Sequence, residues 1–271
     1  MRISRHISEA FGIGLRYHKP SSAETTVSSF LLLNILDVGR AFGHRPLRTT
    51  PEEVCDWLLT EYALKRGGGF NYDPAIKTLF ALFQGRIALE QAKAICATSG
   101  NPKGRAHNVD AIGCAGPYAE ANRSTCYPIG YTAVAVGRAL GKTVYIGMKA
   151  PMVRVANDSA FVVLPGFRKG HKPVGPQVDL ACSIALAALA RDDFSEADFE
   201  YLDAGNSYDG KRALTVHLGR EHHVYGADDV DAILDVYVRG VALALETGVS
   251  VMEANLRGYR VIDPDQPSMF G

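Results

Sequence analysis

The sequence contains no apolar run long enough to cross a bilayer. The longest, from Phe30 to Leu36, is interrupted by Asn34 and is far shorter than the roughly 20 residues that a membrane-spanning helix needs. The first residues, Met1 to His6, include basic side chains, but no uninterrupted apolar segment with a small-residue cleavage site follows them, as a secretory signal would require. We therefore predict a cytoplasmic protein with no membrane partner.

Cysteine pairs, net charge and the strongest catalytic signatures are also lacking. The five cysteines are odd in number and form no CxxC pair, which argues against a disulfide framework or a zinc ribbon. The chain has 29 Lys and Arg against 29 Asp and Glu, which excludes a strong overall field for polyanions. Motifs of the types GxGxxG, GxxxxGK(S/T), HExxH and GxSxG are absent, which disfavours dinucleotide, triphosphate, zinc-protease and α/β-hydrolase chemistry.

The composition is that of an ordinary globular protein. The 271 residues are 47% hydrophobic and 21% charged, and a chain of this length can bury a substantial core. The pattern predicts an α/β fold, in which a mixed β-sheet is flanked by helices and a helical layer comes first. We expect a single domain over residues 1–271, mainly helical over 1–141 and strand-rich over 142–271.

Periodicity and turn signals place the elements along the chain. Starts such as Thr50-Pro51 and Asp73-Pro74, followed by apolar residues at helical spacing, predict helices. The expected helices are 27–41, 51 to the glycines at 67–69, 74 to Gly85 or to Ala97, 129–140, 176–191 and 228–246. The expected strands are 143–146, 152–156, 160–164, 199–202, 213–218 and 221–225, with turns at Asn157-Asp158 and Gly219-Arg220. Residues 99–126, rich in Gly, Asn and Pro, are expected to be irregular.

Charge is distributed unevenly along the chain. Residues 123–172 contain eight Lys or Arg and only one acid, Asp158, whereas residues 179–235 contain four basic and 13 acidic residues. A basic block of strands favours a surface that follows phosphate groups, even in a neutral molecule. The alternative is that both blocks are solvated faces that neutralise each other.

Four residues form a dense cluster of metal-ligand types, namely His217, Glu221, His222 and His223. Imidazole and carboxylate are suitable ligands for zinc or manganese. If Gly219-Arg220 is a hairpin turn, strand alternation allows only one of the adjacent histidines to face His217. Because two ligands make an incomplete site, an exposed polar hairpin is the preferred interpretation, and no metal site is assigned.

Two cysteines are candidates for a nucleophile. Cys114 lies between glycines, and Cys126 precedes Tyr127-Pro128, with His107 or His171 as candidate bases. A catalytic thiol needs a base within hydrogen-bond reach, which the sequence does not establish. Structural, reduced thiols are the preferred interpretation.

After Gly141 the expected order is strand, hairpin, a helix that opens with Gln177, two strands and a final helix. This order resembles the C-terminal half of the PD-(D/E)XK nuclease fold, particularly its RecB-like branch. Such nucleases carry an Asp and then acid-x-Lys on consecutive strands, followed by Gln-x-x-x-Tyr on the helix. Here residues 162–169 occupy the acid-x-Lys strand, with Leu164 and Pro165 where a carboxylate would stand, and Ala181 replaces the Tyr. The resemblance therefore implies a catalytically degenerate nuclease fold that keeps a nucleic-acid surface.

The resemblance also implies which side chains contact DNA or RNA. The implied contacts are Arg154, Arg168, Lys169, His171, Lys172 and Gln177. The alternative for Arg168 to Lys172 is an exposed, solvated loop. Two other functions stay open at this stage. One is a small-molecule enzyme that uses Cys114 or Cys126 with a histidine, and the other is a non-enzymatic protein whose charged blocks pair between copies in a homo-oligomer or a larger assembly.

Overall fold

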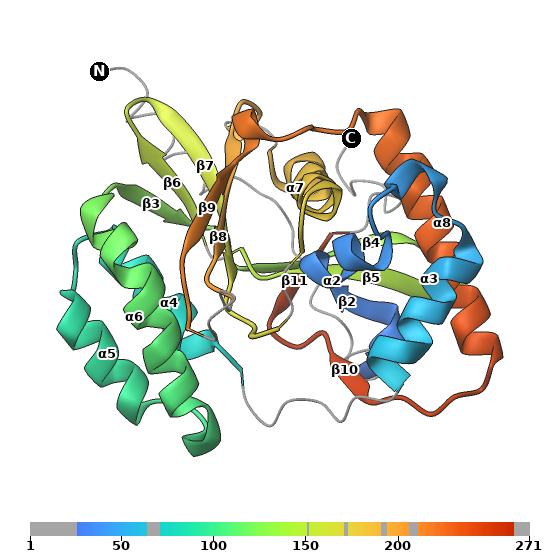
Figure 1. Cartoon of the computed structure of the whole chain (residues 1–271), viewed down its shortest axis with the longest axis horizontal. Helices are drawn as coiled ribbons and strands as arrows, with labels where there is room; N and C mark the ends of the chain where they lie inside the picture. The colour runs from blue at the N-terminus through green and yellow to red at the C-terminus, as the bar shows by residue number, and fades with distance from the viewer. Residues whose placement is uncertain are drawn as a thin grey trace, which may run out of the picture.

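The computed structural model describes residues 26–63, 71–150, 152–170, 173–190, 194–205 and 211–262, and it has the predicted α/β class (Figure 1). The larger sheet has five strands in the order β3-β6-β7-β8-β9, in which only β7 and β8 are parallel neighbours. Its strands are β3 (Thr125–Pro128), β6 (Met152–Ala156), β7 (Ser159–Gly166), β8 (Asp198–Asp203) and β9 (Thr215–Leu218).

A second mixed sheet has four strands in the order β11-β4-β5-β2. The central pair, β4 and β5, is antiparallel, whereas β11 is parallel to β4 and β2 is parallel to β5. These strands are β2 (Leu32–Asn34), β4 (Tyr131–Ala139), β5 (Lys142–Met148) and β11 (Tyr259–Ile262), and a separate ribbon pairs β1 (Thr26–Ser28) with β10 (Glu253–Asn255). Both large sheets therefore combine strands from the 1–141 and 142–271 parts of the chain.

Helices separate and cover the sheets (Figure 1). One face of the five-stranded sheet is covered by α4 (Asp73–Phe83), α5 (Leu89–Thr98) and α6 (Arg105–Ala121). On its other face, α7 (Pro176–Leu189) packs against α2 (Ile35–Ala41), which in turn contacts β5. The outer face of the four-stranded sheet carries α8 (Ala227–Glu246), and α3 (Pro51–Leu58), continued by a π turn over Leu59–Ala63, packs on α8. Short 3-10 helices lie at Ser29–Leu31 (η1), Pro46–Arg48 (η2), Pro102–Gly104 (η4) and Gly219–Glu221 (η6).

The five-stranded sheet divides the hydrophobic core into two clusters. Along β7, Val162 and Leu164 belong to the cluster shared with α7 and the second sheet, whereas Val163 belongs to the cluster under α4 and α6. This alternation is the period of two that a strand imposes on its side chains. Both faces of β7 are therefore buried, and its carboxyl end is where the chain leaves the core.

Several local signals act as predicted. Thr50 and Glu53 form a reciprocal capping box at the start of α3, with Pro51 at the first helical position. The Asn157-Asp158 turn joins β6 to β7, and both residues have positive φ, at 49° and 61°, as a two-residue hairpin turn requires. Of the two expected ends for the helix that begins at Asp73, the earlier one, near Gly85, is confirmed. The glycines at 67–69 lie outside the described residues.

Two segments that are rich in glycine or alanine differ from the prediction. The structure of such segments depends on the elements that pack against them, which the local sequence does not specify. Residues 129–140 form strand β4 rather than a helix, because alternate side chains are buried between α8 and the core while the backbone pairs with β5 and β11. Within the expected irregular segment 99–126, helix α6 covers Arg105–Ala121. Its Gly116 lies where a Cβ would collide with Leu89, so this glycine allows close helix packing rather than a turn.

Two further segments are corrected. Residues 27–41 are helical only from Ile35, where the Asn34 side chain caps α2, and the preceding residues form η1 between two short strands. The expected hairpin strand 221–225 does not form, because β9 ends at Leu218 and η6 turns the chain so that His222 contacts Asp179 of α7. In the described ranges no helix has both the length and the apolar character needed to cross a membrane.

Candidate functional site

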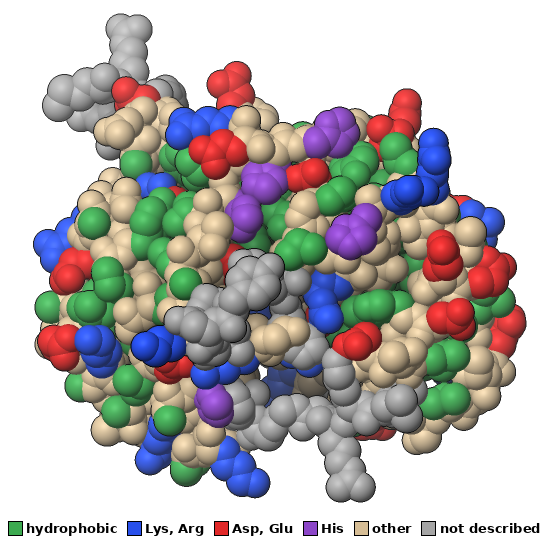
Figure 2. Space-filling view, in the orientation of Figure 1, with side chains coloured by type: hydrophobic (Ala, Val, Ile, Leu, Met, Phe, Trp, Pro, Cys, Tyr) green, Lys and Arg blue, Asp and Glu red, His purple; other side chains and the backbone are tan. Residues whose placement is uncertain are grey.

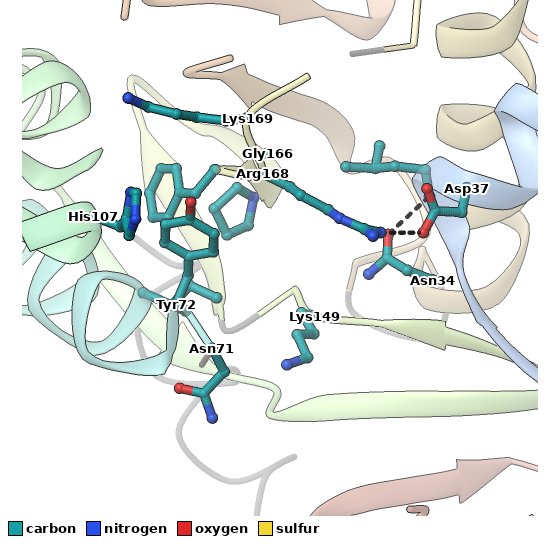
Figure 3. A pocket seen from close by; sticks show the side chains of 13 residues that line it. Asn34, Asp37, Asn71, Tyr72, His107, Lys149, Gly166, Arg168 and Lys169 are labelled. Carbon is teal, nitrogen blue, oxygen red and sulfur yellow. Dashed lines mark hydrogen bonds and ion pairs between the residues drawn. The ribbon is translucent and has the colours of Figure 1, made fainter. Parts of the chain in front are cut away.

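A cavity of about 470 Å³, here called the central pocket, lies where the two sheets present the carboxyl ends of three strands (Figure 3). Asn34 ends β2, Lys149 follows β5, and residues 165–169 end and follow β7. The opposite wall comes from the residues that open α4 and from α6. In open α/β sheets the crevice beyond the carboxyl ends of strands is the usual place for a ligand. The lining consists of Asn34, Leu36, Asp37, Asn71, Tyr72, Ile76, His107, Lys149, Pro165, Gly166, Phe167, Arg168 and Lys169.

A buried carboxylate, Asp37, organises one wall of this pocket. Asn34 accepts a hydrogen bond from the Leu36 amide and so starts α2, which places Asp37 in the first turn. The Asp37 carboxylate accepts hydrogen bonds from Arg168 Nη1 at 3.0 Å, Tyr62 Oη at 2.6 Å and Arg40 Nη1 at 3.1 Å. Burial, followed by the Asp37 charge, raises the pKa of Tyr62, so the phenol stays protonated as a donor.

Arg168 reaches across the pocket to make this contact (Figure 3). Its side chain remains 51% exposed, and of its N–H groups only those on Nη1 are committed to Asp37. A guanidinium held in this way can also bind a ligand oxygen through its remaining donors. The position of Arg168 is therefore set by the protein while part of its donor capacity faces the cavity.

The second guanidinium near the pocket, that of Arg212, has a structural role. Its side chain is only 2% exposed, and Nη1 donates to the carbonyls of Phe167 at 2.8 Å and Ala204 at 2.5 Å. These carbonyls lie just beyond β7 and β8, so Arg212 ties together the carboxyl ends of the parallel pair. Its Nε donates to Asp110 at 2.7 Å, and Asp110 also pairs with Lys169 at 3.2 Å.

The same network changes the acidity of Asp110. Burial raises the pKa of Asp110, but the hydrogen bonds and charges of its two basic partners outweigh this effect and hold the pKa below its usual value. Asp110 therefore remains a carboxylate and keeps Lys169 at the rim of the pocket.

The lining carries a net positive charge. Lys149, Arg168 and Lys169 oppose one carboxylate, Asp37, so the formal balance is +3 − 1 = +2. Lys149 lies 3.5 Å from Asp73 and 5.2 Å from the ring centre of Tyr131, which holds the ammonium group near the cavity. In Figure 2 several basic side chains lie beside and within the hollow near the centre of the face, next to an acidic side chain, whereas a larger group of acidic side chains lies over α3 and α8. The lining is thus cationic, while Asp73 and Asp110, just outside it, offset the charges of Lys149 and Lys169.

One residue expected at a nucleic-acid surface, Arg154, belongs to the core. It is 5% exposed, and its Nε and Nη2 each donate to Glu200 at 2.6 Å. Glu200 is fully buried and also accepts a hydrogen bond from Tyr118. Arg154 lies over the ring of Phe161 at 4.6 Å. Arg154 is therefore committed to a buried ion pair and does not face the pocket.

The other expected contacts have different positions. Arg168 and Lys169 both line the pocket. Gln177 lies in the first turn of α7, where its side-chain oxygen accepts a hydrogen bond from the Val174 amide at 3.2 Å, and it is not part of the lining. His171 and Lys172 lie outside the described residues.

The basic block 123–172 does not form one continuous surface. Lys142 and Lys149 stand at opposite ends of β5, about 23 Å apart at the usual rise of a strand. Among the described basic residues of this block, Lys149, which follows β5, and Arg168 and Lys169, which follow β7, line the pocket.

The candidate thiols are poor nucleophiles in this environment. Cys126 is buried and Cys114 is half-buried, and burial raises the pKa of both thiols above the usual value. A reactive cysteine needs the opposite shift, because the thiolate is the nucleophile. This geometry argues against the thiol-based enzyme.

The histidine cluster is a chain of hydrogen bonds between β9, η6 and α7. His217 Nδ1 lies 3.1 Å from His222 Nε2, and His222 Nδ1 lies 2.7 Å from Asp179 Oδ1. The expected polar hairpin is not formed here, so strand alternation does not select the pair: η6 places His222 against His217, whereas the exposed His223 contacts Tyr225 and Glu221 is exposed. Within the described ranges, no group of three or more His, Cys, Asp or Glu side chains is arranged to hold a metal ion.

Sequence reasoning identified two of the pocket's cationic side chains, Arg168 and Lys169, and named His107 only as a candidate base for a cysteine. Lys149 belonged to the basic block, which was the only signal available for it. Asp37 and His107 come from distant segments and carry no local motif, so only the fold brings them together. No protein-family model, curated protein or solved structure matches this chain.

Proposed function

We propose that the chain binds nucleic acid through the central pocket, with Arg168, Lys149 and Lys169 as the phosphate contacts. The observation that carries this proposal is the convergence of these three cations, from the ends of two different sheets, on one cavity of about 470 Å³. A phosphate oxygen can accept several charge-assisted hydrogen bonds from such a set. The net charge of the whole chain does not oppose this, because attraction at short range depends on local charge.

Each cation is placed before the ligand arrives. Arg168 is held by Asp37, Lys149 lies beside Asp73, and Lys169 pairs with Asp110. Side chains that are already ordered lose less conformational entropy on binding, which favours affinity. The same carboxylates weaken the attraction for a single phosphate, so we expect moderate binding that depends on several contacts and falls steeply with salt.

The relation to the PD-(D/E)XK nucleases remains a proposal. It is supported by the β6–β7 hairpin, the following α7 and the parallel strand β8, which match the order that the resemblance implies. The strand that would carry the metal-binding acid has Leu164, buried in the core, and Pro165, in the pocket wall. We therefore assign binding, and no hydrolytic step, to these residues.

The test is fluorescence anisotropy with labelled DNA and RNA over a range of salt concentrations. For wild-type protein we expect binding at low salt and a linear fall of log K with log salt. Arg168→Gln removes one phosphate contact, so it should weaken binding about tenfold and reduce the salt slope by about 0.7 to 0.9. The matched control is Arg257→Gln, which replaces another exposed arginine, one that lies outside the pocket lining.

Two outcomes would contradict the proposal. One is the absence of measurable binding at 20 to 50 mM salt, where non-specific phosphate contacts are strongest. The other is an Arg168→Gln protein that binds with the wild-type affinity and slope. Asp37 keeps Arg40 and Tyr62 as partners in this variant, so its folding is not at risk.

A further inference from the structure

A second cavity, of about 430 Å³, lies at the other end of α2. It is formed by the C-terminal residues of α2, the loop that leads into η2, and the exposed side of α3. Its polar and aromatic lining consists of Arg40, Phe42, His44, Arg45, Arg48, Thr49, Glu53 and Trp57. Nothing in the proposed role of the central pocket uses this cavity.

The cavity is basic and its basic side chains are available. Three arginines oppose one acid, giving a formal balance of +3 − 1 = +2. Arg45 and Arg48 are exposed, and within the described part of the chain neither forms an ion pair. Glu53 is already used, because its carboxylate accepts a hydrogen bond from the Thr50 amide at 2.8 Å in the capping box of α3. The two free guanidinium groups therefore dominate the charge of the site.

The backbone that carries these arginines is well held. The Thr49 hydroxyl donates to the carbonyls of Phe42 at 2.8 Å and Arg45 at 3.1 Å, which closes the loop on itself. Pro46 is the first residue of η2, and its fixed φ limits the backbone conformations that the loop can adopt. Arg45 and Arg48 consequently project from an ordered turn rather than from a long irregular loop.

An aromatic surface completes the cavity. The Trp57 ring is half-buried, with the Arg40 guanidinium carbon 5.6 Å from its centre and the tilted Tyr62 ring beside it at 5.9 Å between ring centres. An indole held next to guanidinium groups is the combination that single-stranded nucleic-acid sites use, since a base stacks on the ring while cations follow the backbone.

The two cavities are connected through α2. Asn34 and Asp37, at its start, line the central pocket, whereas Ala41 and the residues after it line the second cavity. Arg40 joins them directly, since it lines the second cavity and donates to Asp37, which also holds Arg168. The seven residues of α2 span about 10 Å, so one extended strand can reach both sites.

We propose that the second cavity is a subsite for single-stranded nucleic acid, in which Arg45 and Arg48 contact the backbone and Trp57 stacks on a base. This inference rests on the proposed function of the central pocket and extends it. A single strand is the specified ligand because only an unpaired base can lie flat on the indole.

The chain contains a single tryptophan, and it lies in this cavity, so its fluorescence reports the subsite directly. We expect an unlabelled oligothymidylate to quench Trp57 fluorescence with the same midpoint that anisotropy gives for the labelled strand. Inorganic polyphosphate, which has charge but no bases, should compete for the cations without this quenching. A duplex of equal length should quench much less.

The matching variant is Arg45→Ala with Arg48→Ala. Loss of two contacts to a single strand should reduce the salt slope by about 1.4 and remove most of the quenching. The control is Arg138→Ala with Lys142→Ala, which removes two exposed cations from the β4–β5 turn and should leave both readouts unchanged.

The outcomes separate this inference from the proposed function. Binding by anisotropy without a change in Trp57 fluorescence, or with an unchanged slope in the Arg45 and Arg48 variant, overturns the subsite and leaves the central pocket standing. Equal quenching by polyphosphate overturns base stacking, and equal quenching by duplex overturns the preference for single strands. No binding of any nucleic acid at low salt overturns both proposals.

Discussion

The buried ion pair between Arg154 and Glu200 provides a quantitative test of how the five-stranded sheet is held together. Glu200→Gln preserves the shape of the side chain but removes its charge, which leaves a guanidinium that is 5% exposed without its counter-ion. Breaking a buried pair by removing one partner costs about 3 to 5 kcal/mol. The rings of Phe83 and Phe161, 5.5 and 4.6 Å from the guanidinium carbon, still stabilise the cation. We therefore expect a loss near the lower limit, about 3 kcal/mol.

Replacing the whole network should cost much less. Arg154→Met with Glu200→Leu removes both charges, and adding Tyr118→Phe removes the hydroxyl that would lose its acceptor. Well-packed apolar replacements of buried ion pairs are often neutral, so we expect this triple variant to lie within about 1 kcal/mol of wild type. The contrast between the single and the triple variant is the specific prediction, because a purely steric role for these residues would not produce it.

Urea unfolding followed by circular dichroism measures both free energies of unfolding. A loss below about 1 kcal/mol for Glu200→Gln would refute the reasoning, and so would a triple variant as unstable as the single one. The folded triple variant should also bind nucleic acid like wild type, because Arg154 does not face the pocket. A loss of nucleic-acid binding in a variant that still folds would indicate that Arg154 contacts the nucleic acid.

Three further predictions concern packing, acidity and thiol reactivity. Gly39→Ala should lower the free energy of unfolding measured in urea by about 1 to 3 kcal/mol, despite the higher helix propensity of Ala, because the new Cβ would lie 2.5 Å from the Gln177 carbonyl oxygen. An unchanged urea midpoint would contradict the close packing of α2 on α7. Asp110 has a lowered pKa in the folded state, so its contribution is present above the unfolded pKa of about 3.9 and is lost as pH falls through the folded value. Asp110→Asn should therefore cost about 1 kcal/mol at pH 7, and the difference from wild type should shrink below pH 4, whereas a constant difference would exclude the ionised carboxylate as its cause. Because burial raises the pKa of Cys114 and Cys126, iodoacetamide at pH 8 should modify both thiols more slowly in the folded protein than in the urea-unfolded protein. Rapid modification of either thiol in the folded state would support the hypothesis of an enzyme with a cysteine nucleophile.

Where a signal is complete within a few residues, the sequence alone was sufficient to determine the local structure. The capping box at Thr50 and Glu53, the Asn157-Asp158 turn and the acidic pair Asp228-Asp229 at the start of the expected helix 228–246 each marked an element that the structure contains. The strands β5 to β8 were predicted with the same success, because β-branched residues and the intervening turns mark them locally.

Only the tertiary structure decided the rest. β4 was expected to be helical because alanine and valine suit either structure, and its pairing with β5 and β11 selected the strand. Arg154 is held in the core by Glu200, 46 positions away, and Arg168 is held at the pocket by Asp37, 131 positions away. Local sequence records the intrinsic preference of a segment, whereas the role of a charged side chain depends on its burial and its partner, and both are set when distant segments pack together.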